Sequence, residues 1–182
     1  LEEQDHRGSR CQRAGLVAQQ ARLGGERLAF PKLRQPAVGV IGRAHVIAER
    51  SKDPSTQAGA AVVDTQNVVV GLGYNGFPRG IDSNELPWER AGSFLETKYA
   101  YVCHAEENAV YNANKSTRGC KTYCTLFPCN ECAKTMIQNG ITEVIYESDK
   151  YKDVDAFIAS RRMLELAGVK LRQYISDWAE KE

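Results

Sequence analysis

The sequence lacks long apolar runs and has no excess of charge of either sign. Its longest hydrophobic stretches fall far short of the roughly 18 residues that a membrane-spanning helix needs, although 42% of all residues are hydrophobic. Lys and Arg number 24 against 23 Asp and Glu, so the formal net charge is only +1. A long nucleic-acid footprint normally requires a basic excess. We therefore expect neither a membrane nor a nucleic acid as partner, whereas a small anionic ligand is compatible with this balance.

Cysteine is also sparse, with six in 182 residues, and the N-terminal residues show no basic start followed by an apolar core. Without such a secretory pattern, a cytoplasmic protein with reduced thiols is favoured over a disulfide framework. Cys129 and Cys132 form a Cys-x-x-Cys pair. We expect Cys103, Cys120 and Cys124 to be small buried apolar residues.

The stretch from residue 103 to residue 132 carries the chemistry of the chain. It contains His-Ala-Glu at 104–106 and Pro-Cys-Asn-Glu-Cys at 128–132. The pattern His-x-Glu, a spacer and Pro-Cys-x-x-Cys is the signature of the zinc nucleobase deaminases. His104, Cys129 and Cys132 would supply three zinc ligands and leave a position for water, as in catalytic sites, whereas structural zinc sites have four protein ligands. Glu106 is then the candidate proton carrier.

The spacing also predicts where this site lies. Residues two apart on a helix point about 200° away from each other, so His104 and Glu106 reach one site only at the first turn of a helix. Pro128 beside Cys129 indicates a second helix start, because proline is tolerated where a helix begins and not inside it. Partial positive charge at both helix starts would lower the pKa of the thiols. The sequence therefore predicts a zinc site between two helix N-termini.

The periodicity of apolar residues predicts alternating helices and strands. Helices are expected over 36–50, from 104 onward, from 129 to a C-cap at Gly140, and over 153–167; strands are expected over 58–64, 68–72, 121–126, 142–146 and 169–174. The glycine-rich segment 71–80 is expected to be a loop. This order predicts an α/β fold of three layers (α/β/α) with a five-stranded mixed sheet. The last two strands should be parallel, because a helix crosses between them.

The length suits a single domain with a sizeable core. Residues 1–33 contain scattered arginines among Gly, Gln and Ala and no periodic apolar pattern, which is typical of a disordered segment. We therefore expect a disordered N-terminal extension over residues 1–33, a catalytic domain over 34–176 and a C-terminal tail over 177–182.

Beyond the zinc motif, a series of short stretches resembles the deoxycytidylate (dCMP) deaminases of the cytidine deaminase superfamily. The stretches are RSKDP at 50–54, GYNGFPRG at 73–80, LPW at 86–88, ETKY at 96–99, YVCHAE at 101–106, LFPCNECAK at 126–134, SDKY at 148–151 and AGV at 167–169. They cover roughly residues 46–174, and such a series is far more specific than the zinc motif alone. The resemblance implies a cytidine-deaminase-like fold.

The resemblance implies hydrolysis of dCMP to dUMP and ammonia, which feeds thymidylate synthesis. Zinc would activate the water that attacks C4 of the cytosine, and Glu106 would carry protons to ring N3 and to the leaving amino group. By its motif, Asn75 is expected to contact the sugar or the base. The candidate contacts of the 5′-phosphate are Ser51, Arg50, Lys150 and Tyr151.

The resemblance further implies a homohexamer that is activated by dCTP with Mg²⁺ and inhibited by dTTP. In this sequence Ile81-Asp82 replaces the Cys-Ser that is familiar after the last glycine of the 73–80 stretch, and residues 37–42 lack the aromatic residues common in the first helix. These departures concern regulation and N-terminal packing, and leave the zinc chemistry untouched. Glu107 stands where an apolar residue is frequent, and the sequence does not explain it. The effector is expected near Gly73, Tyr74, Asn75, Gly76 and Gly80.

Three alternatives are compatible with parts of the sequence. A related deaminase could act on another cytosine nucleotide or nucleoside, or on tRNA adenosine, although the stretches at 73–80 and 98–104 favour dCMP. A deaminase-like fold could keep zinc only as a structural or partner-binding module, but such a module has no need of Glu106. A thiol redox protein could use Cys129 and Cys132, and it would bind no metal and form a reversible disulfide.

Overall fold

The computed structural model describes residues 36–175, so the extension expected over residues 1–33 and the tail expected over 177–182 lie outside the described residues. The predicted order of helices and strands is confirmed. The elements are α1 (Pro36–Ala48), β1 (Gly59–Val63), β2 (Val69–Tyr74), the 3₁₀ helices η1 (Phe94–Glu96) and η2 (Lys98–Ala100), α2 (Ala105–Tyr111), β3 (Lys121–Leu126), α3 (Asn130–Gln138), β4 (Glu143–Ser148), α4 (Asp155–Leu166) and β5 (Lys170–Gln173).

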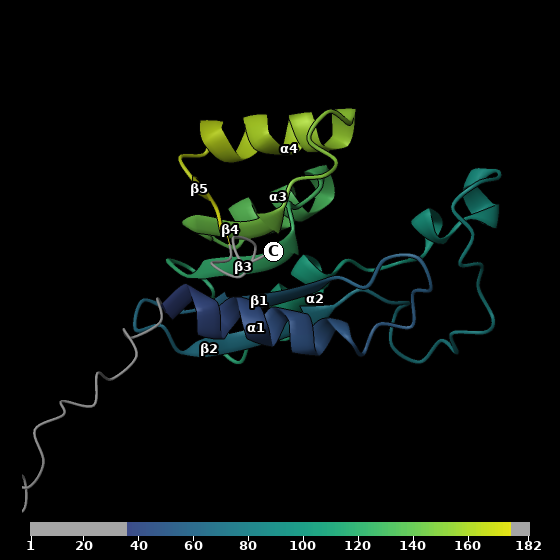
Figure 1. Ribbon diagram of the computed structural model, residues 1–182, viewed down its shortest axis with the longest axis horizontal. Coiled ribbons are helices and arrows are strands. Elements are labelled where there is room, and N and C mark those ends of the chain that lie inside the picture. The colour runs from purple at the N-terminus through teal and green to yellow at the C-terminus, as the bar shows by residue number, and fades with distance from the viewer. Residues whose placement is uncertain (1–35, 176–182) are drawn as a thin grey trace, which may run out of the picture. The chain divides into compact units, whose positions relative to one another are not determined.

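The strands form one mixed sheet of five strands in the order β2-β1-β3-β4-β5 (Figure 1). β1 pairs antiparallel with both β2 and β3, whereas β3, β4 and β5 are parallel to one another. The parallel pairs are those whose strands are joined by α3 and α4, because a parallel connection needs a crossover of this length. The predicted mixed sheet and the predicted parallel last pair are therefore confirmed.

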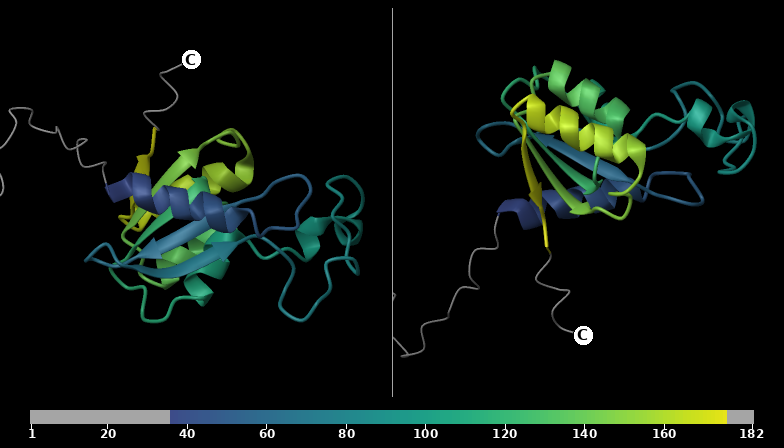
Figure 2. Two further views of the ribbon diagram at one scale, coloured as in Figure 1. Left: turned by 60° about the horizontal axis from the view of Figure 1, so that its bottom comes forward. Right: turned by 90° about the horizontal axis from the view of Figure 1, so that it is seen from above.

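The sheet is covered on both faces. Successive residues of β1 point to opposite faces, so Ala61 and Val63 pack with Val40 and Ala44 of α1 in one core. Ala60 and Val62 pack in the other core, where α2, α3 and α4 supply Ala109, Met136 and Leu164 among others. Figure 2 shows α1 on one side of the sheet and the α3–α4 pair on the other. The predicted α/β/α layering is confirmed.

The glycine-rich segment differs from its predicted loop, because β2 continues through Tyr74. The reason is the close approach of α2 to this edge strand. A Cβ at Gly71 would lie 2.2 Å from the carbonyl oxygen of Ala109, and one at Gly73 would lie 2.2 Å from that of Ala105. Glycine in a strand is favoured where another backbone comes this near. These two glycines therefore set the position of α2 and of the chemistry at its start.

Between β2 and α2 the chain forms a long irregular segment, residues 77–101, which projects from the sheet and helices in all views (Figures 1 and 2). The rings of Phe77 and Trp88 stack within it, with centroids 4.1 Å apart, and the Trp88 indole N–H donates to the Ser83 carbonyl. At its far end Lys98 is buried and bonded to residues that precede β1. This segment is thus tied to the domain at a point close to the start of α2.

Candidate active site

The chain brings its zinc-type donors together at the starts of α2 and α3. His104 is the N-cap residue of α2 and Cys129 that of α3, and both have extended backbone conformations. Cys132 follows in the first turn of α3. The ligand atoms of His104, Cys129 and Cys132, which we call the metal-donor cluster, lie within 4.8 Å of one another. The structure thus places the predicted donors at two adjoining helix starts.

The geometry of the metal-donor cluster is compatible with a single zinc ion. Nδ1 of His104 lies 3.2 Å from the Cys129 sulfur and 3.3 Å from the Cys132 sulfur, and the two sulfurs are 3.6 Å apart. A tetrahedral zinc with ordinary bond lengths holds such donors about 3.6–3.8 Å apart. The donors therefore need to move by only a few tenths of an ångström. One imidazole and two thiolates suit zinc chemically as well.

The cluster is strongly polarised. The hydrogen bond between the side chains of Cys129 and Cys132 lowers the pKa of Cys129 to about 4. The hydrogen bond to Cys129 in turn raises the pKa of His104 to about 9. The same hydrogen bond with Cys129, together with burial, raises the pKa of the Cys132 thiol well above its ordinary value. Metal ligands must be a thiolate or a neutral imidazole, so zinc binding here is coupled to proton release.

Glu106 lies beside this cluster and is only 6% exposed. Its carboxylate is 3.5 Å from the Cys132 sulfur. Burial raises its pKa to about 7, because desolvation disfavours the charged form. A carboxyl group with a pKa near neutrality can both accept and donate a proton, which is what general acid–base catalysis requires.

The structure explains Glu107, which sequence reasoning left unexplained. The His104 backbone N–H donates to the Glu107 carboxylate over 3.3 Å. This is one half of a capping box, in which the third residue of a helix bonds back to the N-cap residue. Glu107 thereby holds the first turn of α2, on which His104 and Glu106 are placed.

A cavity of about 510 Å³ opens beside His104, Glu106 and Cys129. This volume is within the range of small-molecule sites. The cavity is also lined by Arg90, Lys98 and Tyr99 from the projecting segment, by Asn75 after β2, and by Tyr151 and Phe157 from the region before and within α4. Sequence reasoning missed Arg90, Lys98, Tyr99 and Phe157 as lining residues. A cation and an aromatic residue in an irregular segment carry no spacing signal.

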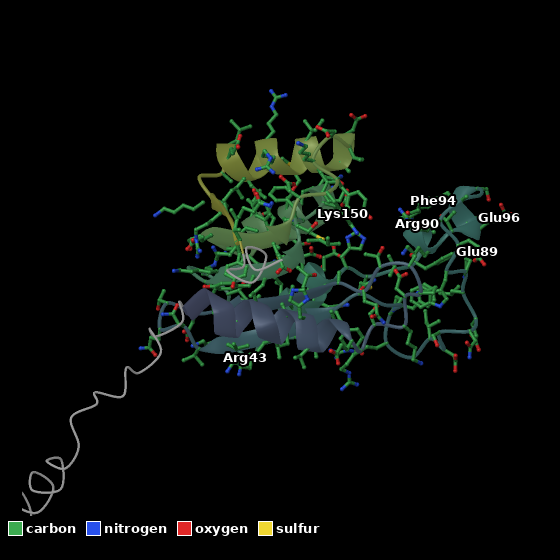
Figure 3. The ribbon with its side chains drawn as sticks, viewed as in Figure 1. Arg43, Glu89, Arg90, Phe94, Glu96 and Lys150 are labelled. Carbon is green, nitrogen blue, oxygen red and sulfur yellow. The ribbon has the colours of Figure 1, made fainter. Side chains whose placement is uncertain are left out.

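Arg90 is the centre of a small group that we call the Arg90 cluster, namely Arg90, Tyr99 and Tyr151. The Arg90 Nε donates to the Tyr99 hydroxyl over 3.2 Å, and Tyr151 faces the same guanidinium. Within residues 36–175 no carboxylate forms an ion pair with Arg90. Figure 3 shows Arg90 on the projecting segment. The cluster therefore adds an uncompensated positive charge to the cavity lining.

Lys98, in contrast, is committed to a buried network around Asp53. Its ammonium lies 2.5 Å from the Asp53 carboxylate and donates to the Ser55 hydroxyl. Burial raises the pKa of Asp53, but the hydrogen bonds from Lys98, Ser55 and Thr56 outweigh it and hold the pKa below its ordinary value. The pair fastens the projecting segment to the chain before β1.

Asn75 belongs to the same network. Its side-chain oxygen accepts from the Ala58 N–H over 2.8 Å, and its amide donates to Asp53 and to the Thr56 carbonyl. Asn75 does line the cavity. Its donors are nevertheless occupied by the protein, so it can offer a ligand only the remaining lone pair of its oxygen.

The four phosphate candidates lie in different places, and of these only Tyr151 lines the cavity. The Ser51 hydroxyl is buried and donates to the Asn75 carbonyl over 2.8 Å. The Arg50 guanidinium lies over the Tyr74 ring, and Lys150 is exposed over the Tyr151 ring (Figure 3). Sequence adjacency to a motif did not indicate which side chains reach the cavity.

The residues expected to bind an effector are divided between a strand and a turn. Gly73 and Tyr74 belong to β2, and Gly76 forms an antiparallel bridge with Cys103. Gly80 has a φ of +90° and open space around it, which is a backbone conformation that favours glycine. Cys120 and Cys124 are buried as expected, whereas Cys103 is half-buried. Among the described residues, no helix is both long and apolar enough to cross a membrane.

Comparison with known proteins agrees with this geometry. The family described as "Cytidine and deoxycytidylate deaminase zinc-binding region" matches residues 38–148. The deoxycytidylate deaminase of Homo sapiens is 53% identical over 134 residues, which cover 72% of this chain and 75% of that protein. The Mus musculus enzyme of the same name is 52% identical over 139 residues, covering 75% and 78%.

Among solved structures, the dCMP deaminase from the cyanophage S-TIM5 in complex with dCMP and dUMP has a TM-score of 0.60 to this chain. The match covers 75% of this chain and 95% of that one at 24% sequence identity. At this identity the likeness shows a shared fold.

Proposed function

Because the chain belongs to the cytidine and deoxycytidylate deaminase family, we propose that it hydrolyses dCMP to dUMP and ammonia. The observation that carries the proposal is a single cavity that combines a zinc-type donor set, the buried carboxylate of Glu106 and the guanidinium of Arg90. A cytosine nucleotide needs all three, because its ring is deaminated and its phosphate is anionic. The product dUMP would supply thymidylate synthesis.

In the proposed mechanism the residues of the chain hold the metal and move protons. His104, Cys129 and Cys132 would hold zinc, which supplies an activated water for attack on C4 of the ring. Glu106 takes up a proton on the side of attack and delivers one to ring N3. The same carboxylate then takes the remaining proton of the added hydroxyl group on C4 and donates it to the amino group, which leaves as ammonia when the C4–N bond breaks. The burial of Glu106 beside the metal-donor cluster, which raises its pKa, suits both directions of transfer.

We assign the 5′-phosphate to Arg90, with the hydroxyls of Tyr99 and Tyr151 beside it. Arginine presents several N–H donors in a planar fork that matches phosphate oxygens. Lys98 is a weaker candidate, because Asp53 already neutralises it. Of the contacts expected from the sequence, Tyr151 is retained in this assignment.

Regulation and assembly are proposed from the resemblance alone. They comprise activation by dCTP with Mg²⁺, inhibition by dTTP and a homohexamer. The cytoplasmic location and the domain limits at residues 34 and 176 stay predictions from the sequence. The placement of Gly73 within β2 favours a packing role for that glycine, and leaves the turn at Gly80 as the more accessible part of the segment.

The test is an ultraviolet assay of cytosine loss with zinc-replete protein. It compares dCMP, CMP, deoxycytidine and dCTP, each with and without dCTP plus Mg²⁺ as effector. We expect dCMP to be turned over fastest and deoxycytidine far more slowly. Faster turnover of a nucleoside would contradict the phosphate assignment. Bound zinc with no turnover of any compound would instead indicate a structural metal site or a different substrate.

A further inference from the structure

Arg161 of α4 contacts Phe127, which lines the cavity, and Asp149, which precedes the cavity-lining Tyr151 by two residues. Its guanidinium lies 4.3 Å from the centroid of the Phe127 ring and 5.8 Å from that of Tyr146. It also forms an ion pair with Asp149 over 2.8 Å. Arg161 itself does not line the cavity. One side chain therefore makes a stacking contact on one side and a charge-assisted hydrogen bond on the other.

The stacking contact supports the turn that carries the metal donors. Phe127 directly precedes Pro128 and Cys129 and is only 2% exposed. Its N–H donates to the Ser148 carbonyl over 2.8 Å, and its ring meets Tyr146 edge-on at 4.8 Å. With these three contacts the position of Phe127 determines where α3 starts. The positions of the Cys129 and Cys132 sulfurs follow from that start.

The ion pair holds the segment that leads to Tyr151. Asp149 opens the turns that lead to α4, since its carbonyl accepts from the Lys152 N–H and the Tyr151 carbonyl accepts from the Val154 N–H. Tyr151, between them, lines the cavity and packs on Phe157 with centroids 5.3 Å apart. The second carboxylate oxygen of Asp149 is buried and has no hydrogen-bond partner among the described residues. Arg161 is thus the side-chain partner that orients this carboxylate.

We propose that Arg161 is a positioning residue. It couples the turn that carries Cys129 to the cavity-lining segment around Tyr151. It touches neither the metal donors nor the reacting atoms, and acts through Phe127 on one side and Asp149 on the other. Groups that orient the ligands of a metal typically change affinity or activity by 10–100-fold when removed. The zinc part of the inference stands on the metal-donor cluster, whereas the substrate part rests on the proposed function.

The stacking contact and the ion pair of Arg161 can be tested separately by substitution. Zinc affinity is measured by competition against a chromogenic chelator, and KM is measured with dCMP. Arg161→Met removes both contacts and should weaken zinc binding and raise KM, each by about ten-fold. Asp149→Asn removes the charge of the ion pair but leaves the stacking, so KM should rise while zinc affinity stays unchanged. Arg161→Lys keeps a charge for Asp149 but loses the planar stack, so zinc affinity should fall while KM stays near the wild-type value.

Arg162→Met is the matched control, because Arg162 is the exposed neighbour on the same helix and its loss changes charge and helix propensity equally. Both of its readouts should stay within two-fold of wild type. The inference is overturned if Arg161→Met matches this control, or if it lowers thermal stability without changing zinc affinity or KM. If Arg161→Met does not fold, the opposite patterns of Asp149→Asn and Arg161→Lys decide. A wild-type protein that binds zinc without turning over dCMP refutes the proposed function. The zinc affinities of the variants still test whether Arg161 positions the metal donors.

Discussion

The metal-donor cluster and the Arg90 cluster lie in the lining of one cavity but are built differently. The first takes its residues from two helix starts, whose helices α2 and α3 are packed into the core that contains Ala109 and Met136. The second takes Arg90 and Tyr99 from the irregular segment 77–101 and Tyr151 from the turns before α4. Chemistry that tolerates little displacement thus sits on regular elements. Recognition of the phosphate end is assigned to segments that the Asp53–Lys98 and Arg161–Asp149 pairs fasten in place.

Glu106→Gln should give the largest effect, at the metal end of the comparison. Glutamine has nearly the same shape but cannot exchange the proton, so kcat should fall by about 10²–10⁴-fold. Zinc content should not change, because Glu106 is not among the donors. Steady-state assay and metal analysis of the same sample check this. Glu107→Gln, the same change one residue on, should leave kcat within a few-fold and lower stability by about 1 kcal/mol, since only the helix cap is weakened. Retained turnover in Glu106→Gln would refute the mechanism.

Asp53→Asn tests the fastening of the projecting segment. Removing one partner of a buried ion pair leaves Lys98 uncompensated and should cost about 3–5 kcal/mol of unfolding free energy at pH 7. The folded-state pKa of Asp53 lies below its ordinary value of 3.8. Its contribution is therefore complete above pH 3.8 and is lost as the pH falls through the folded-state pKa. Urea unfolding measures the free energy of unfolding of both proteins at pH 7 and at pH 3. The difference between variant and wild type should be smaller at pH 3, and an equal difference at both pH values would contradict the ion-pair account.

Arg90→Met tests the phosphate end. Hydrogen bonds to charged groups contribute about 1.5–3 kcal/mol, so KM for dCMP should rise by about 10–100-fold. The slow reaction of deoxycytidine, which has no phosphate, should be unchanged. Arg50→Met and Lys150→Met remove cations outside the cavity lining and should change KM by less than roughly two-fold, as surface substitutions usually do. Equal losses on dCMP and deoxycytidine would show that Arg90 acts on structure and not on the phosphate.

Gly73→Ala should give the smallest effect, and it connects β2 to the metal end. The added Cβ would lie 2.2 Å from the Ala105 carbonyl oxygen, so α2 must shift. Overpacking of this kind costs about 1–3 kcal/mol, and zinc affinity should fall because His104 precedes Ala105. Gly80→Ala is the control. Its added Cβ would have no atom within 4 Å, so this variant carries only the backbone strain of a positive φ. Thermal unfolding and chelator competition on both variants measure the difference, and equal zinc affinity in the two would argue against this packing role.

Several features of the site were predictable because they depend on short spacing. His104 and Glu106 two apart, and Cys129 and Cys132 three apart after Pro128, specify donors at helix starts whatever surrounds them. The structure places the donors at such starts, and the alternation of helices and strands likewise followed from local periodicity. The predicted end of β2 was wrong. Glycine in a sequence indicates a loop, whereas Gly71 and Gly73 are strand residues that lie too close to the backbone of α2 to carry a side chain.

The sequence by itself predicted a donor set, a proton carrier and the order of the sheet-forming elements, because each prediction depends on residues close together in the chain. Only the tertiary structure decided that Arg90 and Tyr151, 61 positions apart, face each other, and that Ser51, Arg50 and Lys150 do not line the cavity. It also decided that Arg161 stacks on Phe127 and pairs with Asp149. Such contacts depend on how the helices pack on the sheet and where the irregular segments meet it. The spacing of neighbouring residues in the sequence does not predict either.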